Sequence, residues 1–287
     1  MKVIIIYNPN STGNGKANAS RLAKELRSKG VDATIRGTLR AGHGGVIAES
    51  YGKRKEEIVL ISSSGDGGYH DVVNGALKHA SPKLIVGVLP SGNANDHFNA
   101  TTSGALIESI KNRTFQKIDT IKVTATVGGK PWVRYAHSYV GMGVTATAAK
   151  RLTRDRPNIL TEKWIVFNAL FSFRSVRLEE NGHRHRYSSI IFGNINRMSK
   201  VMQLSDKSSI TDGKFEMSSI RFGSKLRLLI YLATAATVGL KSAQSLSRYT
   251  CTALRPLLIQ LDGEVYTIDE GSTIQIQSIK QNLRCVL

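Results

Sequence analysis

Three glycines surround a single carboxylate in residues 65–68, which read Gly-Asp-Gly-Gly. Glycine lets backbone N–H groups close on a phosphate because no Cβ intervenes. Asp66 follows the short apolar run 58–61, so it stands at the C-terminal end of a predicted strand, where it could hold Mg²⁺ against a triphosphate. The segment therefore predicts a nucleotide-phosphate site, although Gly-Asp-Gly also occurs in ordinary surface turns.

Two further loops of small and amide side chains follow apolar runs, at residues 8–16 and 89–98. The first lacks the spacing of a P-loop, since Asn10 and Ala17 stand where a glycine and a hydroxyl are required, and it lacks the third glycine of a dinucleotide fingerprint. What remains is a loop that leads into a helix N-terminus, which favours an anion or is a plain capped turn. Three such loops at neighbouring strand ends predict one ligand crevice.

The second half of the chain offers separate carboxylates. Glu264 follows Asp262-Gly263, and Asp212 precedes Gly213. Phosphoryl transfer needs one carboxylate to accept the hydroxyl proton, and Glu264 suits this role if its domain closes over the crevice. Asp-Gly pairs also favour tight hairpin turns, so a purely structural interpretation stays open at both places.

The first 122 residues alternate between short apolar runs and segments of helical spacing. This order predicts βαβ units and a mostly parallel, Rossmann-like sheet. We expect strands at residues 3–7, 33–36, 58–61 and 84–89, and helices at 16–29, 45–53, 72–78 and 105–112.

After residue 122 the pattern changes to a series of strands. Residues 122–136 predict a hairpin that turns at Gly128-Gly129. Further strands are expected at 187–193, 214–220, 257–262, 264–268 and 272–279, with helices near 160–176 and 224–240 and an exposed turn at 183–186. We therefore expect an α/β domain over residues 1–122 and an antiparallel β-sandwich domain over 123–287, with the active site in the cleft between them. Completion of the first domain by the C-terminal residues stays open.

The composition narrows the choice of function. Forty Lys and Arg residues against 21 Asp and Glu residues give a net charge of +19, spread over both halves of the chain. Such a positively charged surface favours binding of phosphate, anionic lipid or nucleic acid. Only two cysteines are present, which favours a reducing compartment. The longest uncharged run, residues 228–240, is shorter than the ~20 residues that span a bilayer, and the apolar start at 3–7 reads as a strand.

The order of these motifs resembles the diacylglycerol kinase catalytic-domain family, which includes sphingosine kinases and is distantly related to NAD kinases. The resemblance covers the three loops, continues through residues 72–75, 141–146 and 211–215, and ends at residues 261–264. It implies a kinase that uses ATP and Mg²⁺. Ser64 and Gly68 depart from the family's usual Gly-Gly-Asp-Gly-Thr, and His70-Asp71 looks closer to the sphingosine kinase version.

The resemblance also implies roles for single residues. Glu264 matches the proton acceptor, with Asp262 beside it as a second catalytic candidate. Asp212 matches the ligand of a structural magnesium, assisted by Ser209 and Lys214. The implied nucleotide contacts are Asn8, Ser11, Gly13, Thr38, Ser64, Gly65, Asp66, Gly67, Gly68, Tyr69, His70, Gly92, Asn93 and Asn95.

The function expected on this basis is phosphorylation of a hydroxyl on a diacylglycerol-like or sphingoid lipid. An NAD kinase-like phosphotransferase and a non-catalytic membrane-binding module stay open as alternatives. We expect a cytoplasmic protein peripheral to an anionic membrane. Aromatic residues around 164–173, flanked by cations including Arg174 and Arg177, would suit insertion at such a surface, but a buried core is the favoured interpretation of this stretch. Nucleic acid is not expected as a partner, and a homodimer stays open.

Overall fold

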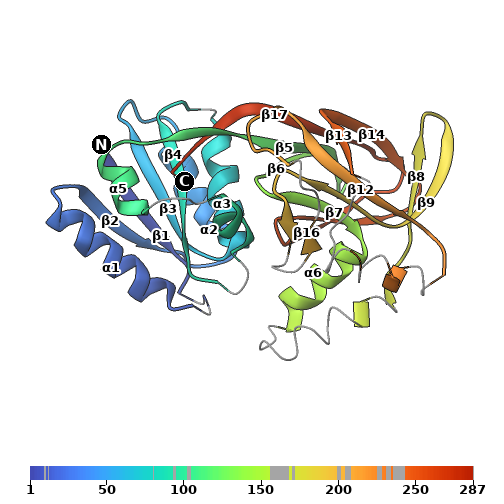
Figure 1. Cartoon of the computed structure of the whole chain (residues 1–287), viewed down its shortest axis with the longest axis horizontal. Helices are drawn as coiled ribbons and strands as arrows, with labels where there is room; N and C mark the ends of the chain where they lie inside the picture. Colours follow the sequence, from blue (N-terminus) through green and yellow to red (C-terminus); the bar gives the residue numbers. More distant parts are fainter. Residues whose placement is uncertain are drawn as a thin grey trace. The chain divides into compact units, whose positions relative to one another are not determined.

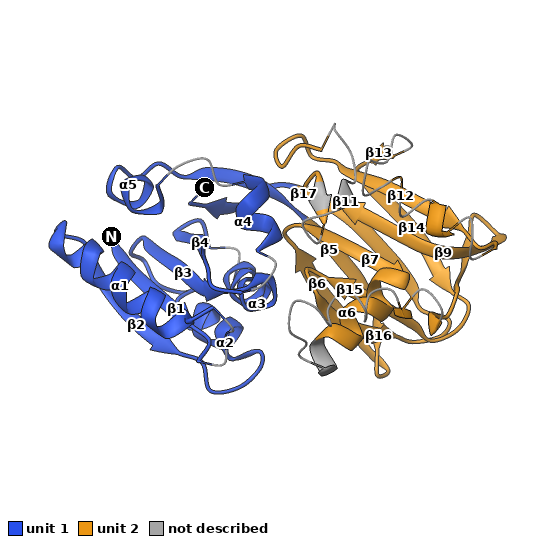
Figure 2. Cartoon of the chain, turned by 60° about the horizontal axis from the view of Figure 1, so that its bottom comes forward, with its two compact units in different colours: residues 1–120, 280–287 blue, residues 121–279 orange. Residues whose placement is uncertain are grey.

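A computed structural model describes residues 1–9, 11, 13–79, 81–92, 95–101, 105–155, 168–169, 172–198, 202–203, 208–224, 228–230, 234 and 243–286. The chain forms two compact units (Figure 2). Unit 1 comprises Met1–Thr120 and Lys280–Leu287, and unit 2 comprises Ile121–Ile279. The last residues of the chain therefore return to the N-terminal unit.

Unit 1 is built on parallel strands in the order β4-β3-β1-β2 (Figure 1). The end of β17 adds a further parallel strand next to β4, where Cys285 pairs with Val86. The strands are β1 (Lys2–Tyr7), β2 (Asp32–Gly37), β3 (Ile58–Ser64), β4 (Leu84–Pro90) and β17 (Thr273–Cys285). The helices are α1 (Gly15–Ser28), α2 (His43–Ser50), α3 (Asp66–Leu77), α4 (Asp96–Thr101) and α5 (Leu106–Lys111).

Burial explains why these strands form a central sheet. Every residue of β3 is buried, and so are the four central residues of β1. On one face, α1 and α5 contribute Leu22, Leu26 and Ile110 to a core that also contains alternate residues of β1, β3 and β4. The pair α2–α3 packs closely because both helices carry glycine at the contact: a Cβ on Gly75 would lie 2.1 Å from the carbonyl oxygen of Gly45.

Unit 2 consists of mainly antiparallel strands in the order β16-β15-β7-β9-β8-β14-β17, with β12 and β13 branching from β9 and the hairpin β5–β6 joined to β17. One core cluster, which includes Phe192, Phe215 and Ile259, connects these strands. The strands are β5 (Gln116–Val127), β6 (Lys130–Ala136), β7 (Tyr139–Gly143), β8 (Val176–Glu180), β9 (His183–Gly193), β12 (Phe215–Arg221), β13 (Gln244–Leu246), β14 (Arg248–Ala253), β15 (Leu257–Leu261) and β16 (Glu264–Ile268). A separate pair, β10 (Arg197–Met198) and β11 (Met202–Gln203), and the helix α6 (Val144–Asp155) complete the described elements.

The predicted fold class is confirmed, and several element boundaries differ. Helix α3 begins at Asp66 rather than at 72, so the glycine-rich segment is its first turn. Residues 183–186 belong to strand β9, and the turn lies just before them, with Asn181 and Gly182 at positive φ. The predicted helices at 160–176 and 224–240 fall largely outside the described residues, and 176 opens β8. Of the helices described, none has the length and apolar character needed to cross a membrane.

Candidate functional site

The three predicted loops of unit 1 converge on Ser91. The Ser91 N–H donates to the carbonyl oxygen of Ser64 at 3.0 Å, and the Ser91 carbonyl accepts the N–H of Gly13 at 3.2 Å. The hydroxyl of Ser11 also donates to that carbonyl. Because β1, β3 and β4 are parallel neighbours, their C-terminal ends meet at one edge, and these bonds tie the loops that follow them into one unit.

Two side chains brace the same junction. The Asn18 amide donates from Nδ2 to the carbonyl of Gly13 at 2.9 Å and to Oγ of Ser91 at 3.0 Å. The buried Ser63 hydroxyl donates to the carbonyl of Gly15 at 2.9 Å and lies 3.1 Å from Oγ of Ser91. Sequence reasoning did not assign roles to Asn18, Ser63 or Ser91, although a run of hydroxyl side chains at the end of an otherwise apolar strand was a usable signal.

The first turn of α3 faces this junction. Its N-cap, Gly65, provides no side-chain hydrogen bond, and the first amides of a helix have no intrahelical acceptor. Gly92 approaches closely: a Cβ there would lie 2.5 Å from the Cα of Gly65. Asn95, at φ 53°, closes the third loop by accepting the Gly92 N–H at 3.2 Å and donating to its carbonyl at 2.7 Å. An uncapped helix N-terminus beside a glycine contact is suited to bind an anion.

The carboxylate of Asp66 links α3 to α4. Its Oδ2 accepts the N–H of Asp96 at 3.0 Å, and its Oδ1 lies 3.3 Å from the N–H donor of His97. A carboxylate is an acceptor-only group when it is ionised, and its oxygens can also serve as cation ligands. Asp66 therefore has a structural role that the sequence did not indicate, and its chemistry still fits Mg²⁺ held together with a triphosphate.

Other expected nucleotide contacts divide into two groups. Asn8 and Thr38 lie at the ends of β1 and β2, where the Thr38 N–H donates to the carbonyl of Tyr7 at 2.9 Å. Tyr69 and His70, by contrast, are only 1% exposed. The Tyr69 hydroxyl lies 3.7 Å from the Cys285 sulfur, so the two side chains support α3 from inside unit 1 rather than lining its open edge. Asn93 falls outside the described residues.

The catalytic candidates of unit 2 occupy the hairpin between β15 and β16. Asp262 and Gly263 have φ values of 51° and 95° and form the predicted tight turn, since Leu261 pairs with Glu264 across it. The Asp262 side chain is buried and accepts the N–H groups of His137, Ser138 and Tyr139 at 2.9–3.1 Å. Asp262 therefore anchors the start of β7. This role is structural and differs from the expected role of a second catalytic carboxylate. Glu264 is half-buried beside it.

The expected magnesium ligands form a local turn. Oδ1 of Asp212 accepts the N–H of Lys214 at 2.9 Å, and the hydroxyls of Ser209 and Thr211 are 3.3 Å apart. Within the described ranges, no three acidic, histidine or cysteine side chains gather as a cation site. Among the described residues, this turn thus offers the carboxylate of Asp212 and the hydroxyls of Ser209 and Thr211.

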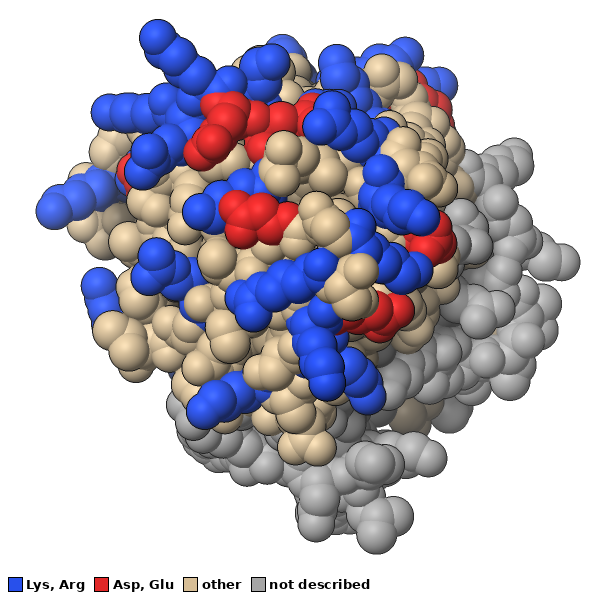
Figure 3. Space-filling model, turned by 90° about the vertical axis from the view of Figure 1, so that its left-hand side faces the viewer, with Lys and Arg blue, Asp and Glu red and all other residues tan. Residues whose placement is uncertain are grey.

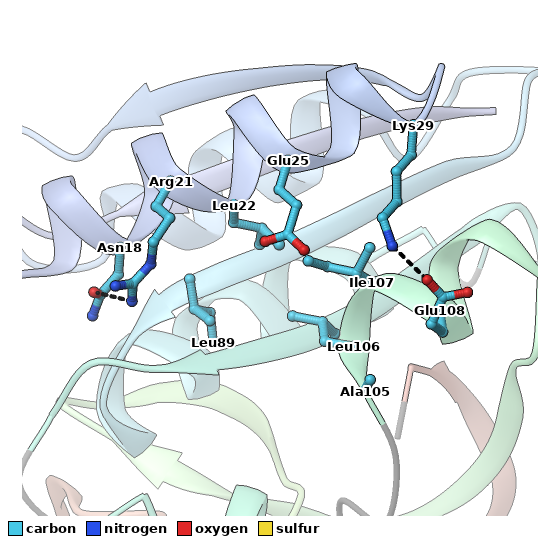
Figure 4. A pocket seen from close by; sticks show the side chains of 10 residues that line it. All are labelled: Asn18, Arg21, Leu22, Glu25, Lys29, Leu89, Ala105, Leu106, Ile107 and Glu108. Carbon is cyan, nitrogen blue, oxygen red and sulfur yellow. Dashed lines mark hydrogen bonds and ion pairs between the residues drawn. The ribbon is translucent and has the colours of Figure 1, made fainter.

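A shallow groove of about 250 Å³ lies on the face of unit 1 between α1 and α5 (Figure 4). At one end Lys29 bonds to Glu108 at 2.5 Å, and at the other Arg21 bonds to Asn18 at 3.1 Å. Leucine and isoleucine side chains line the floor between them. Asn18 is shared with the Ser91 junction, so the groove adjoins the loops without lying over the first turn of α3. Its lining residues are Asn18, Arg21, Leu22, Glu25, Lys29, Leu89, Ala105, Leu106, Ile107 and Glu108.

Comparison with known proteins shows a family match over part of the chain and a shared fold. Residues 2–123 match the family model of the diacylglycerol kinase catalytic domain, which indicates a kinase. Two solved structures from Bacillus anthracis str. Sterne, a diacylglycerol kinase and a putative one, share the fold, with TM-scores of 0.71 and 0.72, identities of 14% and 13%, and coverage of 99% of this chain and 96% of theirs. Yeast NADH kinase complexed with NADH also shares it, with a TM-score of 0.56 and 11% identity over 100% of this chain and 83% of that one. A search of curated proteins finds no match to the sequence.

Proposed function

Because residues 2–123 match the diacylglycerol kinase catalytic domain, we propose that the chain is an ATP-dependent lipid kinase. It transfers the γ-phosphate of ATP to a hydroxyl of a diacylglycerol-like or sphingoid lipid. The observation that carries this proposal is the junction at Ser91, where three loops meet beside the uncapped N-terminus of α3. Phosphoryl transfer depends mainly on positioning and charge neutralisation, and a rigid set of backbone donors supplies both.

Different residues bind the phosphates of the donor and activate the hydroxyl of the acceptor. The first-turn amides of α3 bind the phosphates, since the N-terminus of a helix presents backbone donors and favours negative charge. Glu264 accepts the proton of the lipid hydroxyl, as a half-buried carboxylate on a hairpin fixed by Asp262. Asp66 would hold Mg²⁺, and the cation would neutralise phosphate charge together with the nucleotide.

Phosphate transfer from γ-labelled ATP into lipid extracts tests this function. We expect a labelled product in the organic phase, at least about 100-fold reduced by Asp66→Asn and by Glu264→Gln. The matched controls are Asp32→Asn and Glu270→Gln, which change the same chemical groups at exposed positions and should keep full transfer.

The same assay separates the alternatives. Label that stays in the aqueous phase on added NAD would replace the proposal with an NAD kinase-like activity, whose fold this chain shares. If the folded chain transfers label to no acceptor, the proposal would be replaced by the alternative of a non-catalytic module.

A further inference from the structure

Four arginines gather in unit 2 around Ser175. Arg255 donates from its guanidinium to the Ser175 carbonyl at 2.6 Å and to its Oγ at 2.9 Å. Arg186 donates from Nε to the same Oγ at 2.8 Å. Arg177 pairs with Arg186 across the β8–β9 ladder, and Arg174 immediately precedes Ser175. We call this group the arginine cluster.

The positive charges of the arginine cluster are not balanced by carboxylates of the described residues. Burial, together with the charges of Arg177, Arg186 and Arg174, lowers the pKa of Arg255. Within the described part of the chain, no carboxylate lies at ion-pair distance from any of the four guanidinium groups, whereas nearby Arg184 does contact Glu179 at 3.9 Å. Two of these like charges, on Arg186 and Arg255, are held by hydrogen bonds to the same serine. An external anion would relieve the repulsion within the cluster.

Aromatic surface adjoins the cluster. The Arg186 guanidinium lies 3.6 Å from the centroid of the Phe222 ring, and Phe222 is 41% exposed. Phe173 stands next to it, with ring centroids 6.5 Å apart, and packs with Ile220 and Leu228 in a small apolar cluster. An exposed ring covered by a cation suits the boundary between lipid headgroups and acyl chains, where the ring enters the apolar layer and the guanidinium stays with phosphate.

The charges on unit 1 differ from this arrangement. On the face drawn in Figure 3, basic and acidic side chains are interspersed. Several lysines of unit 1 are paired, including Lys29 with Glu108 and Lys78 with Glu49. The positive surplus of unit 1 is therefore partly neutralised on the surface. Arg284 of unit 1 also lies over an aromatic ring, 5.1 Å from the centroid of Phe115, but it is paired with Glu57 at 2.7 Å.

We infer that the arginine cluster and Phe222 form a docking surface for a bilayer that carries anionic phospholipids. This docking surface would bring unit 2 to the bilayer that contains the lipid acceptor. The purpose of docking, though not the binding, rests on the proposed function. The binding itself needs neither nucleotide nor turnover, so it can fail or succeed independently of kinase activity.

Vesicle co-sedimentation of the full chain, without ATP, tests the surface. The probes are vesicles of phosphatidylcholine alone and of phosphatidylcholine mixed with phosphatidylglycerol. We expect binding to the anionic vesicles that weakens with salt. Each basic residue near such a surface contributes about fivefold in partitioning, so Arg174→Gln/Arg177→Gln should lower it about 25-fold. Both side chains are exposed, which preserves the fold.

The matched control is Lys53→Gln/Lys55→Gln, which removes the same charge from exposed positions of unit 1 and should bind like the unchanged chain. Phe222→Ala should weaken binding at high and low salt alike, because it removes an apolar contact. Equal losses in the two double variants, or equal binding to both vesicle types, would overturn the inference. So would full displacement by 10 mM inorganic phosphate at constant ionic strength, which would indicate a small-anion site instead.

Discussion

Asp262 shows how a residue that resembles part of a catalytic pair can have a structural role. Its carboxylate accepts three backbone N–H groups at the start of β7. The residue also occupies the left-handed region at φ 51°, which Asp and Asn tolerate better than most residues. The same position thus closes the hairpin that presents Glu264 and anchors that hairpin to β7.

Substitutions separate these two roles. Asp262→Ala should lower the free energy of unfolding by about 3 kcal/mol, because three buried donors lose their acceptor and alanine is strained at this φ. Glu264→Gln should change it by less than about 0.5 kcal/mol, since the side chain is half-buried and similar in shape. Chemical denaturation of the two variants measures both values. Equal destabilisation by the two would contradict this division of roles.

The buried cysteines affect stability at high pH. Burial raises the pKa of Cys285 to about 12 from 9.0, against a small opposing effect of the Tyr69 hydroxyl. The folded state therefore keeps a proton that the unfolded state loses. The stabilisation is complete below about pH 9 and is lost as the pH rises toward 12, at about 1.4 kcal/mol per pH unit.

Denaturation of the unchanged chain and of Cys285→Ala between pH 8 and 10.5 checks this effect, because the comparison cancels the titration of tyrosines and lysines. We expect the unchanged chain to lose stability more steeply above pH 9. Parallel curves would show that the thiol is not held protonated in the folded state.

At the scale of elements, the contact between Gly65 and Gly92 sets the distance between the end of β3 and the loop after β4. A Cβ at Gly92 would lie 2.5 Å from the Cα of Gly65 and would displace backbone, and a Cβ at Gly65 would make a tight contact of 3.3 Å with the Cα of Gly92. A Cβ at Gly44 would make ordinary contacts at 3.5 Å and beyond. The separation of the loops, and thus the spacing of the proposed phosphate donors, depends on these two glycines.

Gly92→Ala should therefore destabilise unit 1 by about 1–3 kcal/mol and weaken ATP binding at least about tenfold, because the loops must separate. Gly44→Ala should be within about 1 kcal/mol of the unchanged chain and bind ATP normally. Thermal unfolding and titration calorimetry measure both quantities. Normal ATP affinity in a folded Gly92→Ala chain would show that the nucleotide does not use this contact.

Elements were predictable where local pattern and burial agree. The apolar run of β3 is buried through its length and those of β1 and β4 through most of theirs, and the helical spacing of Leu22 and Leu26 matches the buried face of α1. The early start of α3 was missed because glycine disfavours helix by about 1 kcal/mol per residue. Glycine is nevertheless suited to these positions, because a Cβ on Gly68 would lie 2.4 Å from Oγ of Ser64 and a Cβ on Gly65 would lie 3.3 Å from the Cα of Gly92.

At the scale of the whole molecule, the chain crosses between the units twice. Strand β17 runs from unit 2 into unit 1, where Cys285 pairs with Val86 and Val286 joins the core under α1. The sequence boundary near 122 lies close to the observed division after Thr120. The return of the C-terminus depends on a long-range pairing, and local patterns carry little information about such pairings.

For the candidate site, the position of the loops was predictable from the sequence and the bonds between them were not. The three loops were identified because each follows a strand of one parallel sheet, and that topology alone brings their ends together. The bracing by Asn18, Ser63 and Ser91 could not be deduced, since it depends on side-chain bonds between residues 28 to 80 positions apart. The structural roles of Asp66 and Asp262 were hidden for the same reason.

A crystal structure of the chain with Mg²⁺ and a non-hydrolysable ATP analogue tests the central claim most directly. We predict triphosphate density at the first turn of α3, within hydrogen-bonding distance of the amides of residues 66–68, with the cation on Asp66. Density for the analogue in the groove between α1 and α5, with none at α3, would contradict the claim that the junction at Ser91 holds the nucleotide.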